Sequence, residues 1–300
     1  MFLRPASCPS CGGPVPEEAI GRSFATCAHC GATFSPSGRA VFRAPFRRSL
    51  EEAEAAVSRG AIQLRQRSYV PECTLAESDH AVVVLARVEV PVVERVVLKL
   101  ARSAERVERE RAVLSALAEA DVPGRARFTT RLPQLVASGV AELDDARTPA
   151  IAVRARSGWL HTMRDVADAF PDGVDGRHVV WMWRRVLETL GFAHRAGWVH
   201  RRLSADHLVV GAHDHGVLVV GWAGAAQVGD AEPRADLAAL ARVFGDVGAP
   251  LPEPLATLLR ASLEGAHADA WALGDAVGHA ARAAYGPPAF HPLSLPAFRR

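Results

Sequence analysis

The sequence predicts an α+β protein of two lobes, the first rich in strands and the second rich in helices, preceded by a small metal-binding module. Paired cysteines near the start indicate the module. Apolar and β-branched stretches over 61–100 indicate the strands, and apolar residues at helical spacing after residue 104 indicate the helices. The 300 residues are 49% hydrophobic and 23% charged, which is typical of a globular chain and argues against disorder or a fibrous repeat.

The charge balance provides no strong electrostatic case for an anionic partner. A formal net charge of +2 gives little reason to expect nucleic acid or an anionic membrane as the main partner. The first residues contain no signal-peptide core, and no later apolar run is long enough to span a bilayer. We therefore expect a cytoplasmic protein that makes no membrane contact.

Four of the five cysteines form two CxxC pairs, each followed by a glycine: Cys8, Cys11, Cys27 and Cys30. Two such knuckles supply four thiolates for a tetrahedral zinc site, and glycine permits the tight turn that each knuckle needs. Two disulfides are the alternative, which a cytoplasmic location disfavours. Residues 5–35 resemble a zinc ribbon. Four thiolates fill the coordination shell, so the expected zinc is structural rather than catalytic.

A linker and a short helix are expected between this module and the lobes. The stretch 35–48 is rich in Pro, Ser and Arg, and Ser49 with Glu52 forms a capping-box pattern that opens a helix to about Arg59. The remaining cysteine, Cys73, is expected to be a small buried residue. The predicted division is 1–35 zinc ribbon, 36–60 linker and short helix, 61–153 first lobe and 154–300 second lobe.

The first lobe is predicted to begin with three strands and a helix. The strands cover 61–70, 81–90 and 95–100, with turns expected at Pro71-Glu72 and Pro91. The helix covers 104–120, where apolar residues recur at helical spacing between charged ones.

Lys99 stands out because it is the only lysine in a chain rich in arginine, and a compact ammonium is not equivalent to a guanidinium. The segment Val96-Val97-Leu98-Lys99-Leu100 resembles the third strand of the protein-kinase fold. The resemblance places Lys99 where nucleotide phosphates are held and makes Glu110, in the next helix, its partner. The two residues are therefore candidates for binding ATP. Alternatively, they form an ion pair that only fixes the helix against the sheet.

The rest of the chain follows the same order of elements. Residues 150–153 resemble the strand before the interlobe hinge, 154–158 the hinge, and 179–194 a long helix. The segment 199–210 resembles the catalytic loop H-R-D-L-x-x-x-N with its strand, and 217–223 stands where the next strand and D-F-G belong. Over about 60–285 the sequence thus implies a bilobal protein-kinase-like fold with an N-terminal zinc ribbon.

The departures from the kinase pattern fall on the residues that phosphoryl transfer needs. The catalytic base should be aspartate and is Arg202, which cannot accept a proton. The asparagine that serves the second magnesium is His207, and the aspartate that serves the principal magnesium is Gly221. Magnesium prefers oxygen ligands, and none of the expected ones is present at these positions.

Two segments also lack features that the kinase pattern has. No glycine occurs between residues 61 and 122, so the turn expected over 70–80 cannot cover phosphates as a glycine-rich loop does. Only residues 222–235 separate Gly221 from Asp236, where the next helix is expected to open. This activation region is short and has no A-P-E tripeptide.

A narrower resemblance is to bacterial zinc-ribbon, kinase-like proteins of the tellurite-resistance-associated phosphorylation systems. It rests on Trp181-Met182-Trp183-Arg184-Arg185, on the segment 193–197 and on the tail 285–292. The resemblance implies two protein partners, a von Willebrand A-type protein and a metal-dependent phosphatase.

These observations favour a pseudokinase that serves as a regulatory or scaffolding protein in a bacterial signalling or stress-response complex. The alternative is an ATP-binding protein kinase or small-molecule phosphotransferase with unusual or weak activity, which needs replacement carboxylates. The candidates are Asp206, Asp214 and Asp230.

Two further hypotheses concern other ligands. His207, His213 and His215 could hold a second metal, although histidines beside Asp and Gly are also ordinary in exposed turns. The ribbon could contact nucleic acid through a basic flank made of Arg39, Arg43, Arg47 and Arg48, but no aromatic ladder accompanies these residues.

Overall fold

The computed structural model describes residues 25–26, 33–34, 60–88, 94–143, 146–213 and 215–296. The chain divides into two compact units, residues 1–61 and 62–300. In the first unit, strand β1 (Ala25–Thr26) pairs antiparallel with β2 (Thr33–Phe34). The four paired cysteines, the basic flank over 39–48 and the helix expected from Ser49 lie outside the described residues.

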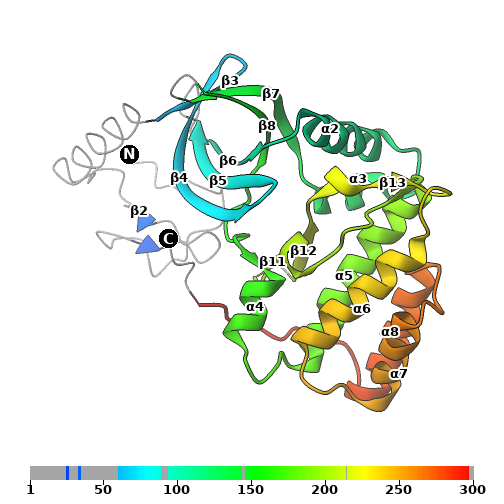
Figure 1. The fold of residues 1–300 in the computed structure, drawn as a ribbon. Coiled ribbons are helices and arrows are strands. Elements are labelled where there is room, and N and C mark those ends of the chain that lie inside the picture. The colour runs from blue at the N-terminus through cyan, green and yellow to red at the C-terminus, as the bar shows by residue number, and fades with distance from the viewer. Residues whose placement is uncertain are drawn as a thin grey trace, which may run out of the picture. The chain divides into compact units, whose positions relative to one another are not determined.

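The second unit begins with a closed six-stranded barrel, in which the strands follow the order β3-β4-β5-β6-β8-β7 (Figure 1). The strands are β3 (Ile62–Leu64), β4 (Arg67–Ser78), β5 (Ala81–Val88), β6 (Glu94–Ala101), β7 (Leu135–Leu143) and β8 (Ala146–Arg154). Side chains alternate across each strand, so that Val96 and Leu98 fill the barrel core while Lys99 points to the outer face. The barrel therefore presents the only lysine to whatever packs against β6.

The start of the barrel differs from the predicted pattern. The stretch 61–70 is not one strand, because a turn at Arg65-Gln66 separates β3 from β4, and Arg65 takes a positive φ of 56°. The turn predicted at Pro71-Glu72 is wrong, since β4 continues to Ser78. A register shift between Pro71 and Cys73 accommodates the proline, whose missing N–H is tolerated at such bulges.

One long helix packs between the barrel and the second lobe. Helix α2 (Ala104–Glu119) begins at Ser103, whose hydroxyl accepts the N–H of Arg106. It packs against β7 and β8 on one side and against the short helix η4 (Trp222–Gly224) on the other. The short helices α3 (Arg125–Phe128) and η2 (Thr129–Arg131) connect it to β7.

The second lobe is built around helix α5 (Gly176–Arg195), whose apolar stripe is fully buried at Trp183, Leu187 and Leu190. Around it lie α4 (Met163–Ala169), α6 (Pro233–Val247), α7 (Glu253–Leu263) and α8 (Ala270–Tyr285) (Figure 1). The small strands are β9 (His161–Thr162), β10 (Trp198–Val199), β11 (Leu208–Gly211), β12 (Gly216–Val219) and β13 (Ala226–Gln227). Helix α6 begins at Pro233, three residues before the predicted opening, so Asp236 lies within its first turn.

The chain ends in a tail that follows α8. Residues 287–296 contain no helix or strand, yet Leu293 is buried in the core of the lobe. Among the described residues, no helix is both long and apolar enough to cross a membrane.

Candidate functional site

Lys99 and Glu110 form an ion pair between the barrel and α2. The Lys99 ammonium donates to Glu110 Oε2 over 2.7 Å, and the side chains are 22% and 7% exposed. The pair exists because β6 turns Lys99 outward and α2 buries Glu110 against the same face. Removing either partner leaves a poorly hydrated charge, which costs about 3 kcal/mol in comparable buried pairs. The contact is thus structural whether or not a ligand also uses Lys99.

The loop that follows β10 is held in place by the carboxylate of Asp236. Its Oδ2 accepts the N–H of His200 over 2.7 Å, and its Oδ1 accepts the N–H of Arg201 over 2.7 Å. Asp236 is fully buried, and His194 Nε2 lies 3.1 Å from its Oδ2. Arg201 consequently takes a φ of 68°, which residues other than glycine rarely adopt. The loop conformation is fixed by a helix more than thirty residues later in the chain.

Arg202 is the residue that the sequence resemblance aligns with the catalytic base. It is exposed, and the aliphatic part of its side chain lies against Gly224, where a Cβ would come within 2.8 Å of Arg202 Cδ. A guanidinium remains protonated and has no acceptor lone pair, so it cannot take a proton from an attacking hydroxyl. Arg202 itself therefore cannot serve as a general base.

His207 ends the short helix η3 (Ala205–His207), and its imidazole is packed into the floor of the loop. Its Nδ1 lies 3.0 Å from Ser204 Oγ, and its ring meets the His200 ring edge to face at 5.3 Å between centroids. His200 in turn packs edge to face on Trp222 at 4.8 Å. Burial, reinforced by His200, lowers the pKa of His207 from 6.5 to about 4. The side chain is neutral at pH 7.

Gly221 and His207 fit each other. Gly221 has a φ of 84°, and a Cβ built on it would lie 2.2 Å from His207 Cδ2 and 2.7 Å from Nε2. The imidazole therefore fills the space into which a side chain at position 221 would project. His207 and Gly221 thus form one packing arrangement, because the histidine requires the glycine.

The turn between β4 and β5 is too short to cover a ligand. Ser78 pairs with Ala81, so the connection consists of Asp79 and His80 alone, and the Ser78 hydroxyl accepts the N–H groups of His80 and Ala81. The turn expected over 70–80 is thus mostly strand, and its two loop residues include no glycine.

The candidate replacement carboxylates that the structure describes do not gather around the loop that follows β10. Asp206 makes a two-pronged ion pair with Arg164, at 2.7 and 2.9 Å. The hydrogen bond from Arg164 lowers the pKa of Asp206. Asp230 is exposed in the turn after β13, and Asp214 lies outside the described residues.

The three histidines weighed for a second metal are also separated. His207 faces His200, whereas His215 stacks on Trp181 at 4.3 Å. His213 lies beside Gly158, where a Cβ would come within 4.0 Å of its ring. The described part of the chain contains no group of three or more His, Cys, Asp or Glu side chains placed to hold a metal ion.

Two residues of the site were not assigned a role from the sequence. Asp236 was interpreted only as a helix start, and His200 only as part of a loop motif. Burial shows their importance, since both are fully buried polar residues. An aspartate on an otherwise apolar helix face, beside Leu237 and Leu240, is the one sequence signal that could have identified the anchor.

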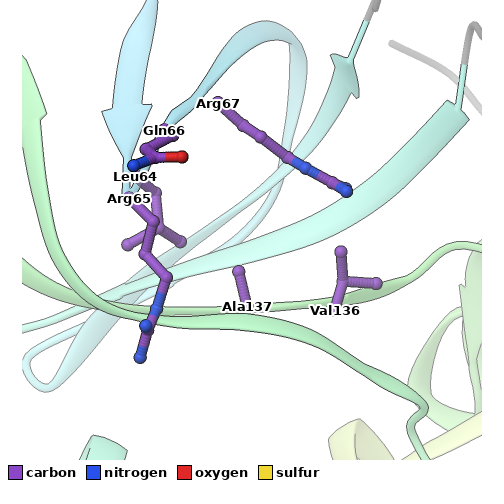
Figure 2. Close-up of a pocket in the computed structure, with 6 residues that line it drawn as sticks. All are labelled: Leu64, Arg65, Gln66, Arg67, Val136 and Ala137. Atoms are coloured by element: carbon purple, nitrogen blue, oxygen red, sulfur yellow. The ribbon is translucent and has the colours of Figure 1, made fainter. Parts of the chain in front are cut away.

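A hollow of about 610 Å³ lies elsewhere, at the turn between β3 and β4. Figure 2 shows the side chains around it: Leu64, Arg65, Gln66, Arg67, Val136 and Ala137. None of the predicted site residues lines it. Arg65 is also committed to the fold, because its Nε donates to the carbonyl of Ser138 over 2.7 Å. The hollow therefore belongs to the barrel and not to the candidate site.

Comparison with known proteins identifies the fold of the second unit. No protein-family model matches the chain, and no curated protein matches its sequence. Among solved structures it is similar to vaccinia related kinase 3, with a TM-score of 0.60 and 12% identity, over 78% of this chain and 96% of that one. It is also similar to the kinase domain of BubR1, with a TM-score of 0.60 and 8% identity, over 74% and 82% of the two chains. The second unit has a protein-kinase-like fold.

Proposed function

We propose that this chain is a pseudokinase, a kinase-fold protein that regulates or scaffolds a bacterial signalling or stress-response complex without transferring phosphate. The observation that carries the proposal is the fit of His207 to Gly221. An imidazole packed over a glycine supplies neither of the two oxygen ligands that magnesium would need there. Regaining such a site takes two substitutions and not one.

Arg202 supports the same proposal, because the sequence resemblance aligns it with the catalytic base. Phosphoryl transfer to a hydroxyl needs a group that accepts the hydroxyl proton and orients the oxygen. The replacement candidate Asp206 is neutralised by Arg164, at 2.7 Å. The loop nevertheless keeps its conformation through Asp236, as a binding surface would require.

A structural zinc in the N-terminal ribbon is part of this proposal. Cys8, Cys11, Cys27 and Cys30 would hold it, and they would contribute folding energy to a module too small for a core of its own. Support comes from the pairing of β1 with β2, because this antiparallel pair brackets the second CxxC pair in the sequence. Chelation should unfold this module and leave the unit 62–300 folded.

Protein partners are proposed from the resemblance of the sequence. A von Willebrand A-type protein and a metal-dependent phosphatase are the partners it implies, and the exposed loop around Arg202 is one surface for them. We propose no membrane role, and a net charge of +2 gives no support to nucleic acid as partner.

A second candidate function is favoured by one observation. The Lys99–Glu110 pair has the arrangement in which a lysine is oriented toward nucleotide phosphates. A protein that binds ATP, as a sensor or as a weak kinase or phosphotransferase, would use Lys99 in this way.

Titration calorimetry of the zinc-loaded full chain with ATP, with and without magnesium, separates the two candidates. A pseudokinase without nucleotide gives no saturable heat at millimolar ATP. Saturable binding that disappears in Lys99→Met identifies a nucleotide sensor, provided that the variant keeps its circular dichroism spectrum. Phosphate transfer to a protein or small molecule that depends on Lys99 would overturn the pseudokinase proposal.

A further inference from the structure

The tail that follows α8 is attached to the lobe at two places, by an aromatic stack at Phe290 and by the buried side chain of Leu293. The His215 ring, in the turn between β11 and β12, lies parallel to Trp181 on one side and close to parallel to Phe290 on the other, at 4.3 and 4.1 Å between centroids. Its Nε2 donates to the carbonyl of His291 over 2.7 Å. Stacked rings with a hydrogen bond at their edge define both the position and the register of the tail.

Three histidines from three separate segments meet at this attachment. His178 comes from the first turn of α5, His215 from the turn and His291 from the tail. The His178 ring lies 6.4 Å from the His215 ring and 6.5 Å from the His291 ring. His178 Nδ1 accepts the Trp181 indole N–H over 3.1 Å, which requires that nitrogen to be unprotonated. We call these three residues the histidine cluster.

The surrounding charges act on the cluster in opposite directions. Asp175 and Arg177, at the start of α5, face His178 and pair with each other at 3.2 Å. Arg185 donates to the backbone carbonyl of His215 over 3.2 Å and brings a fixed positive charge. Asp214 precedes His215 in the chain and lies outside the described residues. Tyr285, at the end of α8, packs under Arg177 at 5.2 Å.

Burial favours the neutral form of His178. It lowers the pKa of His178, and the neighbouring His215 and His291 add to this, whereas Asp175 opposes it. Release of the tail would expose the His178 imidazole to water, where a histidine protonates near pH 6.5. Protons therefore bind the released form more readily, and docking of the tail weakens as the pH falls below about 6.5.

The attachment also adjoins the segment that joins the two lobes. Trp159 packs on Gly216, the residue after His215, so closely that a Cβ there would lie 2.2 Å from the indole. Arg156 in turn lies 5.0 Å from the centre of the Trp159 ring. The tail, the turn and the interlobe connection are thus in continuous contact.

We propose that residues 286–291 form a reversible strap, which the histidine cluster holds on the lobe while His178 is neutral and releases when His178 gains positive charge. Release frees Phe290, which is already 63% exposed, and uncovers Trp181 next to the interlobe connection, while the buried Leu293 keeps the following residues on the lobe. The proposal is independent of whether Lys99 binds nucleotide.

Hydroxyl-radical footprinting of the full chain, read by mass spectrometry near pH 7.5 and near pH 5.5, tests the strap. Oxidation of Trp181 should rise about threefold at the lower pH, because most of the water-exposed His178 of the released form is protonated there. Trp183 and Trp222 are fully buried and report unfolding. If these two tryptophans stay protected, the strap has opened without unfolding of the lobe.

Variants identify the residues that cause the change in Trp181 oxidation. Phe290→Ala removes one side of the stack from an exposed position and should raise Trp181 oxidation already near pH 7.5. The variant His178→Gln cannot gain charge at this position and should lose most of the pH response. His279→Ala, on the exposed surface of α8, is the matched control and should behave as the wild type.

Each of the following results would overturn the proposal. If Trp181 oxidation is unchanged by both pH and Phe290→Ala, there is no strap to release. If the pH response persists in His178→Gln, His178 does not control it. Oxidation of Trp183 that rises together with Trp181 would mean unfolding of the lobe and would also overturn the proposal.

Discussion

The contact between β6 and α2 and the loop over residues 200–224 differ in how they compare with the kinase pattern that the sequence resembles. The first has a charged pair at 2.7 Å, with Glu110 almost fully buried. The second has a backbone held by Asp236, and it carries Arg202, His207 and Gly221 at the positions that the resemblance aligns with the reactive groups. Both regions meet at η4, which packs against α2 and follows directly from Gly221.

This difference separates the residues that position a site from those that do its chemistry. Asp236 and the Lys99–Glu110 pair are buried and bonded, so losing either would cost stability even in a protein without activity. Ligands for magnesium and a catalytic base contribute little to folding, and they can be replaced by side chains that pack. We expect substitutions in the two classes to affect stability by different amounts.

The largest effect is expected at the anchor. Asp236→Asn replaces one acceptor oxygen with a donor, so one of two buried N–H groups loses its partner, and the free energy of unfolding should fall by about 4 kcal/mol. Urea denaturation followed by circular dichroism measures it. Asp230→Asn, at an exposed aspartate, is the control and should change stability by less than about 0.5 kcal/mol. Equal effects for both variants would show that the loop is not held by Asp236.

The ion pair comes next. Glu110→Gln leaves the Lys99 ammonium without a charged partner and should lower the free energy of unfolding by about 3 kcal/mol. The matched control is Glu105→Gln, because Glu105 pairs with Arg109 on the exposed face of the same helix and such pairs contribute about 0.5 kcal/mol. A double-mutant cycle with Lys99→Met isolates the coupling. A coupling near zero would contradict a structural role for the pair.

A smaller but more specific effect is expected where His207 meets Gly221. Gly221→Asp should cost about 2 kcal/mol, because the new side chain meets the imidazole and the φ of 84° disfavours a Cβ. Adding His207→Asn should recover about half of that loss by making room. Thermal or urea denaturation of the single and double variants measures the recovery. Strictly additive losses would show that the two positions do not share one packing arrangement.

The smallest expected effect is a pH dependence of stability. The pKa of His207 is lowered from 6.5 to about 4 by folding, so the unfolded chain binds a proton first as the pH falls. Stability present above pH 6.5 should decline by about 1 kcal/mol between pH 6.5 and 5.5 on this account. The fall continues until the folded pKa is passed. His207→Asn should flatten the urea midpoints over this range, and an unchanged slope would place the titration elsewhere.

Local patterns in the sequence predicted the helix over 104–120, which the structure has as Ala104–Glu119, and a strand over 95–100, which it has as Glu94–Ala101. Periodicity of apolar residues fixes these elements because it dictates one buried face. The prediction of a turn at Pro71-Glu72 was wrong, because proline is compatible with a bulge in a strand. The turn at Arg65-Gln66 carries none of the residues that normally mark turns, so no local rule could have found it.

The sequence by itself determined the identities of Arg202, His207 and Gly221, and its resemblance to the kinase pattern aligned them with the groups of phosphoryl transfer. It also indicated the pairing of Lys99 with Glu110 through resemblance. Only the tertiary structure decided what the replacements do: that His207 packs over Gly221, that Asp236 anchors a loop far away in the chain, and that the tail returns to stack on His215. These contacts join residues separated by more than ten positions, and packing between distant segments leaves no periodicity in the sequence of either one.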